Sequence, residues 1–141
     1  MMYFDELAAG DSAEFTKTVT ETDVVLYAGI TGDLNPAHVD EVSASAGRFG
    51  GRIAHGMLVA GFISTVLGTR LPGPGTIYLS QSLRFVAPVR LGDTVTARVE
   101  VAELLPKRRA RLATTVRNQR GETVVEGEAT VMVPARPEAA E

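Results

Sequence analysis

The spacing of apolar residues predicts different structures in the two parts of the chain. From Glu21 to Ile30, apolar side chains recur at helical spacing and Thr31-Gly32 follows as a suitable stop, so we expect an amphipathic helix there. From Gly56 to Leu67, almost no charged residue occurs on any face. A helix that is apolar all round is buried on most of its sides. We therefore expect this second helix to lie at the centre of the fold.

Alternating apolar and polar residues predict one strand before the first helix and four after the second. The expected strands are Ala13 to Thr20, Thr76 to Phe85, Thr94 to Leu104, Arg109 to Asn118 and Val124 to Val133. Short connections between the last four imply antiparallel neighbours. One buried helix and a long, curved antiparallel sheet make an α+β fold in which the sheet wraps around the helix.

The chain length of 141 residues fits a single domain. We expect that domain to span residues 1–134, with Met1 to Gly10 as a loosely ordered entry and residues 135–141 as a frayed polar tail. A short helix is also expected from Asp40 to Ala46. A domain of this size buries roughly 68% of the surface that its unfolded chain exposes, so a true hydrophobic core is available.

Charge and cysteine content exclude several classes of function. A net charge of -3 provides no general positive field for a nucleic acid backbone or an anionic membrane, so an anionic ligand must be bound locally. The chain has no cysteine, which removes disulfides, thiolate metal sites and a cysteine nucleophile. The stretch Met57 to Leu67 is too short to span a bilayer, and Met1 to Glu6 lacks the features of a signal peptide. We expect a cytoplasmic protein.

Polar groups gather where the first predicted helix ends. Gly32 and Pro36 interrupt the helical pattern, and Asp33, Asn35 and His38 lie beside them. Pro36 disfavours helix at the residue before it, so we expect residues 33–38 to form a tight, defined turn. A carboxylate and an imidazole that share one water molecule can remove a proton from it and deliver a proton elsewhere. Asp33 and His38 are therefore the catalytic candidates.

Other interpretations of this turn stay open. Taken singly, each of its three polar residues is better explained as structural, and Asn35 is expected to brace the turn through side-chain to backbone hydrogen bonds. Asp33, Asn35 and His38 together make a poor metal site, because they supply only one imidazole and one carboxylate. No metal is expected.

The start of the second helix offers a complementary group. Unpaired backbone N–H groups and the positive end of the helix dipole point outward there. Because Gly56 has no Cβ, a ligand carbonyl can approach its N–H as it would an oxyanion donor, although a glycine that only eases helix entry is the simpler explanation. His55 is assigned to fixing the neighbouring loop and not to the catalytic pair. Ser64 either points into the same cavity or bonds back to its own helix.

One basic cluster follows the third of the five strands. Lys107, Arg108, Arg109 and Arg111 are best explained as a solvated turn. They stay weak candidates for holding a phosphorylated ligand, as does Arg84.

The stretch from Tyr27 to His38, with Ala44 six residues further on, resembles the signature of the MaoC-like hydratases, the (R)-specific enoyl-CoA hydratase family. Its core, Gly32-Asp33-Leu34-Asn35-Pro36-Ala37-His38, matches the signature throughout. The resemblance extends over nearly the whole chain and is closest to the short, single-domain, polyhydroxyalkanoate-linked type. The further segments that carry it are Ile53 to Leu58, Leu71 to Gly75 and Tyr78 to Phe85.

The resemblance implies a hot-dog fold and a homodimer whose active sites lie at the subunit interface. It implies that Asp33 and His38 add water to a trans-2-enoyl-CoA to give the (R)-3-hydroxyacyl-CoA, or catalyse the reverse dehydration. It implies that the Gly56 N–H binds the thioester carbonyl and that Asn35 and Ser64 have supporting roles. Leu67 would lie near the acyl pocket, and Val131 on the last strand would help to close it. No metal or redox cofactor is implied, and coenzyme A enters as part of the substrate.

Two alternatives to a hydratase stay open. An acyl-CoA thioesterase is built on the same fold, and a non-catalytic acyl-CoA-binding or subunit-interaction module would keep the fold with a vestigial site. Which of Asp33 and His38 takes which proton, and the preferred acyl chain length, are not assigned from the sequence.

Overall fold

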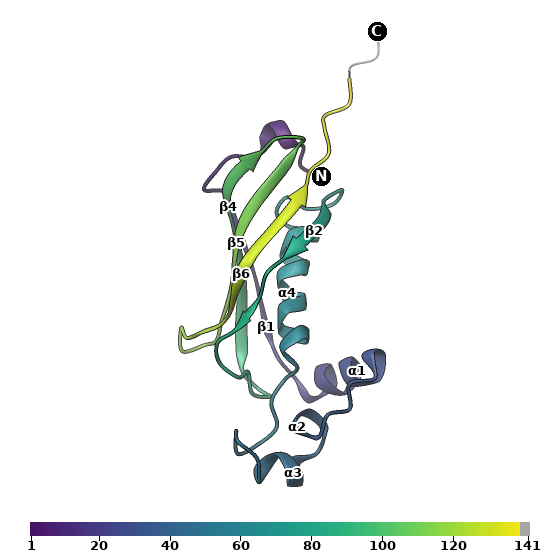
Figure 1. Ribbon diagram of the computed structural model, residues 1–141, viewed down its shortest axis with the longest axis vertical. Coiled ribbons are helices and arrows are strands. Elements are labelled where there is room, and N and C mark those ends of the chain that lie inside the picture. The colour runs from purple at the N-terminus through teal and green to yellow at the C-terminus, as the bar shows by residue number, and fades with distance from the viewer. Residues whose placement is uncertain (139–141) are drawn as a thin grey trace.

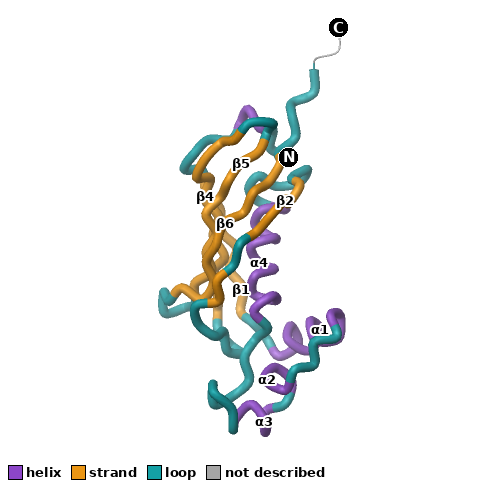
Figure 2. The backbone as a smooth tube through the Cα atoms, viewed as in Figure 1, coloured by secondary structure: helices purple, strands orange, loops and turns teal. Residues whose placement is uncertain are grey.

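The computed structural model describes residues 1–138 and consists of a sheet, one long helix and a group of short helices (Figure 1). In chain order, the elements are a 3-10 turn (Phe4–Glu6), β1 (Ser12–Thr18), α1 (Glu21–Thr31), α2 (Pro36–Val39), α3 (Glu41–Ser45), α4 (Gly56–Thr69), β2 (Ile77–Gln81), β3 (Arg84–Phe85), β4 (Thr94–Leu105), β5 (Arg109–Arg117) and β6 (Thr123–Met132). The helices α1, α2 and α3 gather at one end of α4 (Figure 2). The predicted helices and strands are confirmed, with the differences described below.

The sheet is antiparallel, with β1, β4, β5, β6 and β2 side by side in that order and β3 continuing along β6. Strict alternation along β4 buries Val95, Ala97, Val99 and Val101 on one face of the sheet. The helix α4 contacts β1, β2, β4 and β5. This is the α+β arrangement that the apolar pattern predicts, and it agrees with the hot-dog fold that the family resemblance implies.

The helix α4 is covered on one face only within this chain. Its sheet-facing side chains are buried, namely Val59, Ala60, Phe62, Ile63, Val66 and Leu67. On the opposite face Gly61, Ser64 and Gly68 are exposed, and Met57 is 56% exposed. The expectation that α4 is buried on most sides is therefore not met within one chain, because the sheet curves around one side of the helix without enclosing it. We call the exposed residues 57, 61, 64 and 68 the open face of α4.

The strand predicted from Thr76 to Phe85 is divided into β2 and β3. Both pieces pair with β6, but the register shifts between Tyr78 and Ser80, and the chain crosses close over Gly127 at Ser82. The amide of Ser82 donates to the Glu128 carbonyl at 2.9 Å. A Cβ at position 127 would lie 1.8 Å from the Ser82 carbonyl oxygen, so only glycine permits this crossing.

The segment before β1 and the segment after β6 are held together at the end of the sheet away from α1. The Phe4 amide donates to the Pro134 carbonyl at 2.9 Å, and Leu7 is only 4% exposed. The expected loose entry is therefore wrong, because Leu7 is anchored in the core. In the predicted polar tail, Arg136 pairs with Asp5 at 3.0 Å, and residues 139–141 lie outside the described part. Among the described helices, none has the length and apolar character needed to cross a membrane.

We predict that Gly127→Ala lowers the free energy of unfolding by about 2 kcal/mol or more, because a backbone carbonyl must move to admit the new methyl group. Urea denaturation of the purified protein measures this. The matched control is Gly29→Ala in α1, where an added Cβ meets nothing within 4 Å. The control should be neutral or stabilising. Equal stability of the two variants would show that the Ser82 crossing imposes no constraint.

Candidate active site

The bend between α1 and α2 is built from local capping interactions. The helix α1 ends at Gly32, which has a left-handed φ of 80° and donates its amide to the Ala28 carbonyl at 2.9 Å. The Asn35 side chain accepts from the Ala37 amide at 3.0 Å and so caps α2, with Pro36 as its first residue. The expected tight turn therefore runs directly into a single helical turn, and His38 is carried on that turn.

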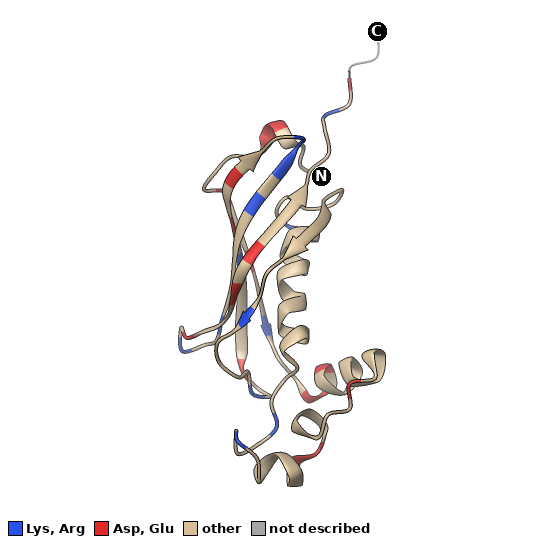
Figure 3. Cartoon of the chain, viewed as in Figure 1, with Lys and Arg blue, Asp and Glu red and all other residues tan. Residues whose placement is uncertain are grey.

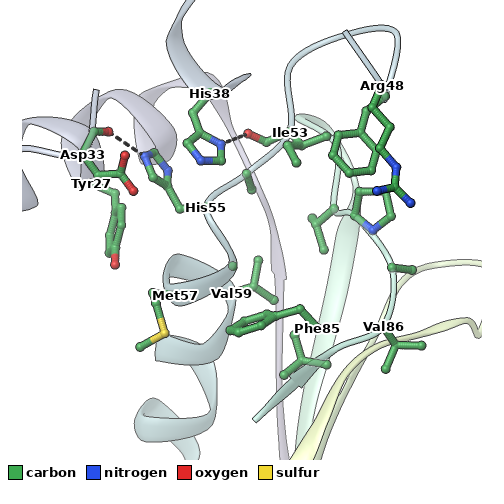
Figure 4. Close-up of a pocket in the computed structure, with 17 residues that line it drawn as sticks. Tyr27, Asp33, His38, Arg48, Ile53, His55, Met57, Val59, Phe85 and Val86 are labelled. Atoms are coloured by element: carbon green, nitrogen blue, oxygen red, sulfur yellow. Dashed lines mark hydrogen bonds between the residues drawn. The ribbon is translucent and has the colours of Figure 1, made fainter. Parts of the chain in front are cut away.

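His38 points from α2 toward the strand-like segment before α4 (Figure 4). Its Nδ1 lies 2.7 Å from the Ile53 carbonyl oxygen, and a carbonyl can only accept, so Nδ1 carries the proton of the neutral ring. Its Nε2 is then left with a lone pair. The ring is partly buried, and its neutral form can accept a proton from a molecule beside it.

His55 lies beneath this ring and is 2% exposed. The two imidazoles are stacked with their centroids 3.9 Å apart and their planes inclined by 29°. The Nε2 atom of His55 lies 3.0 Å from the backbone carbonyl of Asp33, so it is the donor, and its buried Nδ1 has no partner among the described residues. Figure 4 shows this contact joining the start of α4 to the bend.

A cavity of about 610 Å³ brings the bend and the start of α4 together. Asp33, His38 and Gly56 all line it. A carboxylate oxygen of Asp33 and a ring nitrogen of His38 lie within 4.8 Å of each other, which leaves room for a shared water molecule. Gly56 is the first residue of α4, and none of the described backbone carbonyls accepts its amide. The three groups therefore face one space.

The side of the cavity opposite His38 is apolar. The ring of Phe85 lies against Gly56, where a Cβ would come within 2.7 Å of it, so the missing side chain at position 56 also accommodates this ring. The remaining apolar lining comes from the segment before α4, from α4 itself, from the segment after β3 and from β6, with Met57, Val59, Val86, Val89 and Val125 among its members. An apolar chain attached to a polar group near Gly56 would find a matching surface here.

Three residues expected at the site lie elsewhere in this chain. Ser64 is exposed on the open face of α4, and Leu67 and Val131 are 1% and 0% exposed in the core. None of the three lines the cavity. Asn35 lies at the bend as expected, where it caps α2 and does not line the cavity.

The basic cluster is remote from the cavity. Lys107 and Arg108 form the left-handed turn between β4 and β5, and Arg111 pairs with Glu103 at 3.1 Å and Glu128 at 3.0 Å. Figure 3 shows this basic segment at the end of the sheet away from α1, α2 and α3. Within one chain, the cation at the cavity is instead Arg48, which follows α3. No site role was predicted for Arg48, Tyr27 or Phe85, although Tyr27 and Phe85 lie in segments that carry the family resemblance. Tertiary packing brings all three to the site.

Asp33, His38 and His55 each offer a ligand atom within 4.8 Å of the others, as a metal site would. A metal ion lies near the plane of each imidazole that binds it. Two rings stacked at 3.9 Å and inclined by only 29° cannot both direct a nitrogen at one ion without turning. Their present arrangement favours hydrogen bonding over metal ligation.

Comparison with known proteins places the chain in a family. The family described as MaoC like domain matches residues 6–126. The (R)-specific enoyl-CoA hydratase of Rhodospirillum rubrum is 58% identical over 134 residues, covering 95% of this chain and 93% of that protein. The 3-hydroxybutyryl-CoA dehydratase of Methylorubrum extorquens is 54% identical over 140 residues, covering 99% and 88%.

Solved structures agree with this relationship. The unliganded R-hydratase PhaJ1 from Pseudomonas aeruginosa superimposes with a TM-score of 0.92 and 49% sequence identity, covering 99% of this chain and 92% of that chain. The chain therefore belongs to the MaoC-like family and has the hot-dog fold of its R-hydratases.

We predict that both histidines occupy single and opposite tautomers, Nδ1–H for His38 and Nε2–H for His55, because each donates to a backbone carbonyl. A long-range ¹H–¹⁵N correlation spectrum at mildly alkaline pH, where imidazoles are neutral, measures this. The chain has only two histidines, and His55→Gln assigns the signals by removing one set. Mixed tautomers at both rings would contradict the hydrogen bonds described here.

Proposed function

We propose that the protein hydrates trans-2-enoyl-CoA thioesters to (R)-3-hydroxyacyl-CoA, and catalyses the reverse dehydration, with Asp33 and His38 as the proton-transferring pair. The observation that supports this most directly is the meeting of Asp33, His38 and the Gly56 amide at one cavity. Two relatives that are more than half identical to this chain are a hydratase and a dehydratase. The protein is accordingly an enzyme of the hydro-lyase class.

The residues suit the charge changes of this reaction. Conjugation with the thioester carbonyl makes C3 of the enoyl group electrophilic, and negative charge develops on the carbonyl oxygen as water adds. The Gly56 amide, at the N-terminus of a 14-residue helix, is placed to stabilise that oxygen. The pair Asp33 and His38 accepts the proton that water loses on attack at C3 and returns a proton to C2. The net change is the addition of one water molecule across the double bond.

The proposed reaction needs no metal or redox cofactor, because neither electrons nor a hydride are transferred. Coenzyme A enters and leaves as part of the thioester. Arg48 lines the cavity and is a candidate contact for the anionic part of this substrate.

We also propose that the working unit is a homodimer. The open face of α4 leaves Met57 exposed at the cavity wall, and β2 is an edge strand with Ile77, Tyr78 and Leu79 exposed. Unpaired strand edges and contiguous exposed apolar groups favour pairing with another chain. A second copy pairing along β2 would extend the sheet, cover the open face and complete the cavity wall beside Met57.

We predict that Asp33→Asn and His38→Gln each lower kcat for the hydration of crotonyl-CoA by about 100-fold or more, because each removes one half of the proton-transferring pair. Loss of the enoyl absorbance measures the rate. The matched control is Asp11→Asn, whose side chain accepts from the Ala8 amide at 2.9 Å far from the cavity, and it should keep wild-type activity.

The same assay separates the alternatives. Release of free thiol from saturated acyl-CoA, with no hydration of crotonyl-CoA or longer enoyl-CoAs, would identify a thioesterase. Binding of acyl-CoA with neither reaction would identify a binding module. Full hydration by either variant would contradict the assignment of the pair.

We predict that the wild-type protein sediments at about twice the chain mass of 15.0 kDa, and that Gly61→Arg shifts it toward the monomer. An added Cβ at Gly61 meets nothing within 4 Å in this chain, so the variant should fold while its side chain blocks packing against the open face. Ala102→Arg, at an exposed position of β4, is the control and should stay dimeric. A monomeric wild-type protein, or a dimer that Gly61→Arg leaves intact, would contradict this interface.

A further inference from the structure

His55 occupies a unique place between the three groups of the proposed site. It precedes Gly56 directly in the chain, it bonds to the backbone of Asp33 and its ring stacks on that of His38. Among the described residues that line the cavity, His55 is the one whose side chain hydrogen-bonds to the backbone of Asp33. His55 therefore links Asp33 and the ring of His38 directly to the start of α4. The His38 end of the bend is held separately, because the Ile53 amide donates to the Ala37 carbonyl at 3.1 Å and His38 contacts Ile53.

His55 cannot itself transfer protons to a substrate in this arrangement. Its Nε2 donates to the Asp33 carbonyl, and its Nδ1 atom is buried, so neither nitrogen is free to exchange a proton with a substrate. The Nδ1 lone pair also has no described partner, which is unfavourable for a buried polar atom. Simple core packing would be served better by an apolar side chain, so the requirement at this position is for the Nε2 donor and the flat ring.

The Asp33 end of the bend needs such a support because its other contacts are local. Asp33 is exposed, and within residues 1–138 its carboxylate accepts only from the Asn35 amide, at 3.2 Å, in the same bend. The Asp33 amide contacts the hydroxyl of Thr31, also at 3.2 Å. Both contacts move with Asp33 and leave its distance from α4 undetermined. The 3.0 Å contact from His55 is the one that ties the backbone of Asp33 to the helix bearing the carbonyl-binding amide.

We propose that His55 is a positioning residue for the hydratase reaction, which holds the Asp33 carboxylate in register with His38 and with the Gly56 amide. The expected loss of kcat rests on the proposed function, whereas the expected position of the Asp33 carboxylate does not. Proton transfer is sensitive to placement, and a shift of about 1 Å in a reacting group can lower a rate by about 100-fold. Substrate binding along the apolar wall does not depend on this register.

Two substitutions of similar length separate the donor from the packing. His55→Gln keeps an N–H donor at the end of an unbranched side chain, whereas His55→Met fills a similar space without a donor. We expect His55→Met to lower kcat for crotonyl-CoA by about tenfold or more, with KM within about twofold of the wild type. His55→Gln should recover most of that loss. Both variants should show similar melting temperatures.

Crystal structures of the two variants supply a readout that is independent of activity. In His55→Gln the Asp33 carboxylate should stay within 4.8 Å of the His38 ring nitrogen, as in the wild type, and in His55→Met it should move away. If His55→Met does not fold, His55→Asn replaces it, because its shorter amide places the donor near the Nδ1 position and should also lose kcat.

The outcomes are distinct. Wild-type kcat in His55→Met, or equal losses in the Gln and Met variants, would overturn the positioning role. A wild-type protein that hydrates no enoyl-CoA would refute the proposed function instead. In that case, the structures still decide, because an unmoved Asp33 carboxylate in His55→Met would overturn the positioning role as well.

Discussion

The packing of α4 against the sheet is the interaction on which the site depends. Side chains such as Ile63 and Val66, both 0% exposed, fix the helix on the alternating apolar face of β4 and its neighbours. Once the helix axis is fixed, its first amide at Gly56 has a fixed position and direction. The bend after α1 is then brought to that amide by His55 and by the contact of His38 with Ile53. A hydrophobic core thus positions a polar site that lies at its edge.

The open face of α4 connects this core to the oligomeric state. Small residues at Gly61, Ser64 and Gly68 leave the helix backbone accessible, and no described element of the same chain covers it. An apolar helix exposed in this way is unfavourable in water, which is the physical reason for proposing a second copy. Ser64, Leu67 and Val131 fall outside the cavity of the single chain. Only Ser64 lies on the surface that a partner would cover.

The sequence predicts features that depend on local or periodic patterns. Strand alternation and the helix stop at Gly32 are local and appear where the residues indicate. Asn35 braces the bend through its side chain as expected, but it does so as the cap of α2, a helical turn that the residue pattern did not predict. The break between β2 and β3 could not be foreseen, because it arises from the approach of Ser82 to Gly127, two residues far apart in the chain. The lining of the cavity also depends on contacts between distant residues. Leu67 and Val131 were predicted to lie at the acyl pocket, but Phe85 and Arg48 line the cavity instead, because tertiary packing brings them there. The hydrogen bond between His55 and Asp33 could not be predicted from the sequence, because it joins residues that only the fold brings together. The only indication in the sequence was a histidine next to Gly56.

The most direct test is a crystal structure of the Asp33→Asn variant with crotonyl-CoA bound. The thioester carbonyl oxygen should lie about 2.7–3.1 Å from the Gly56 amide nitrogen. The C3 atom should face His38 and the carboxamide at position 33, with room for one water molecule between them. A carbonyl bound away from Gly56, or an acyl chain that does not enter the cavity, would contradict the proposed site.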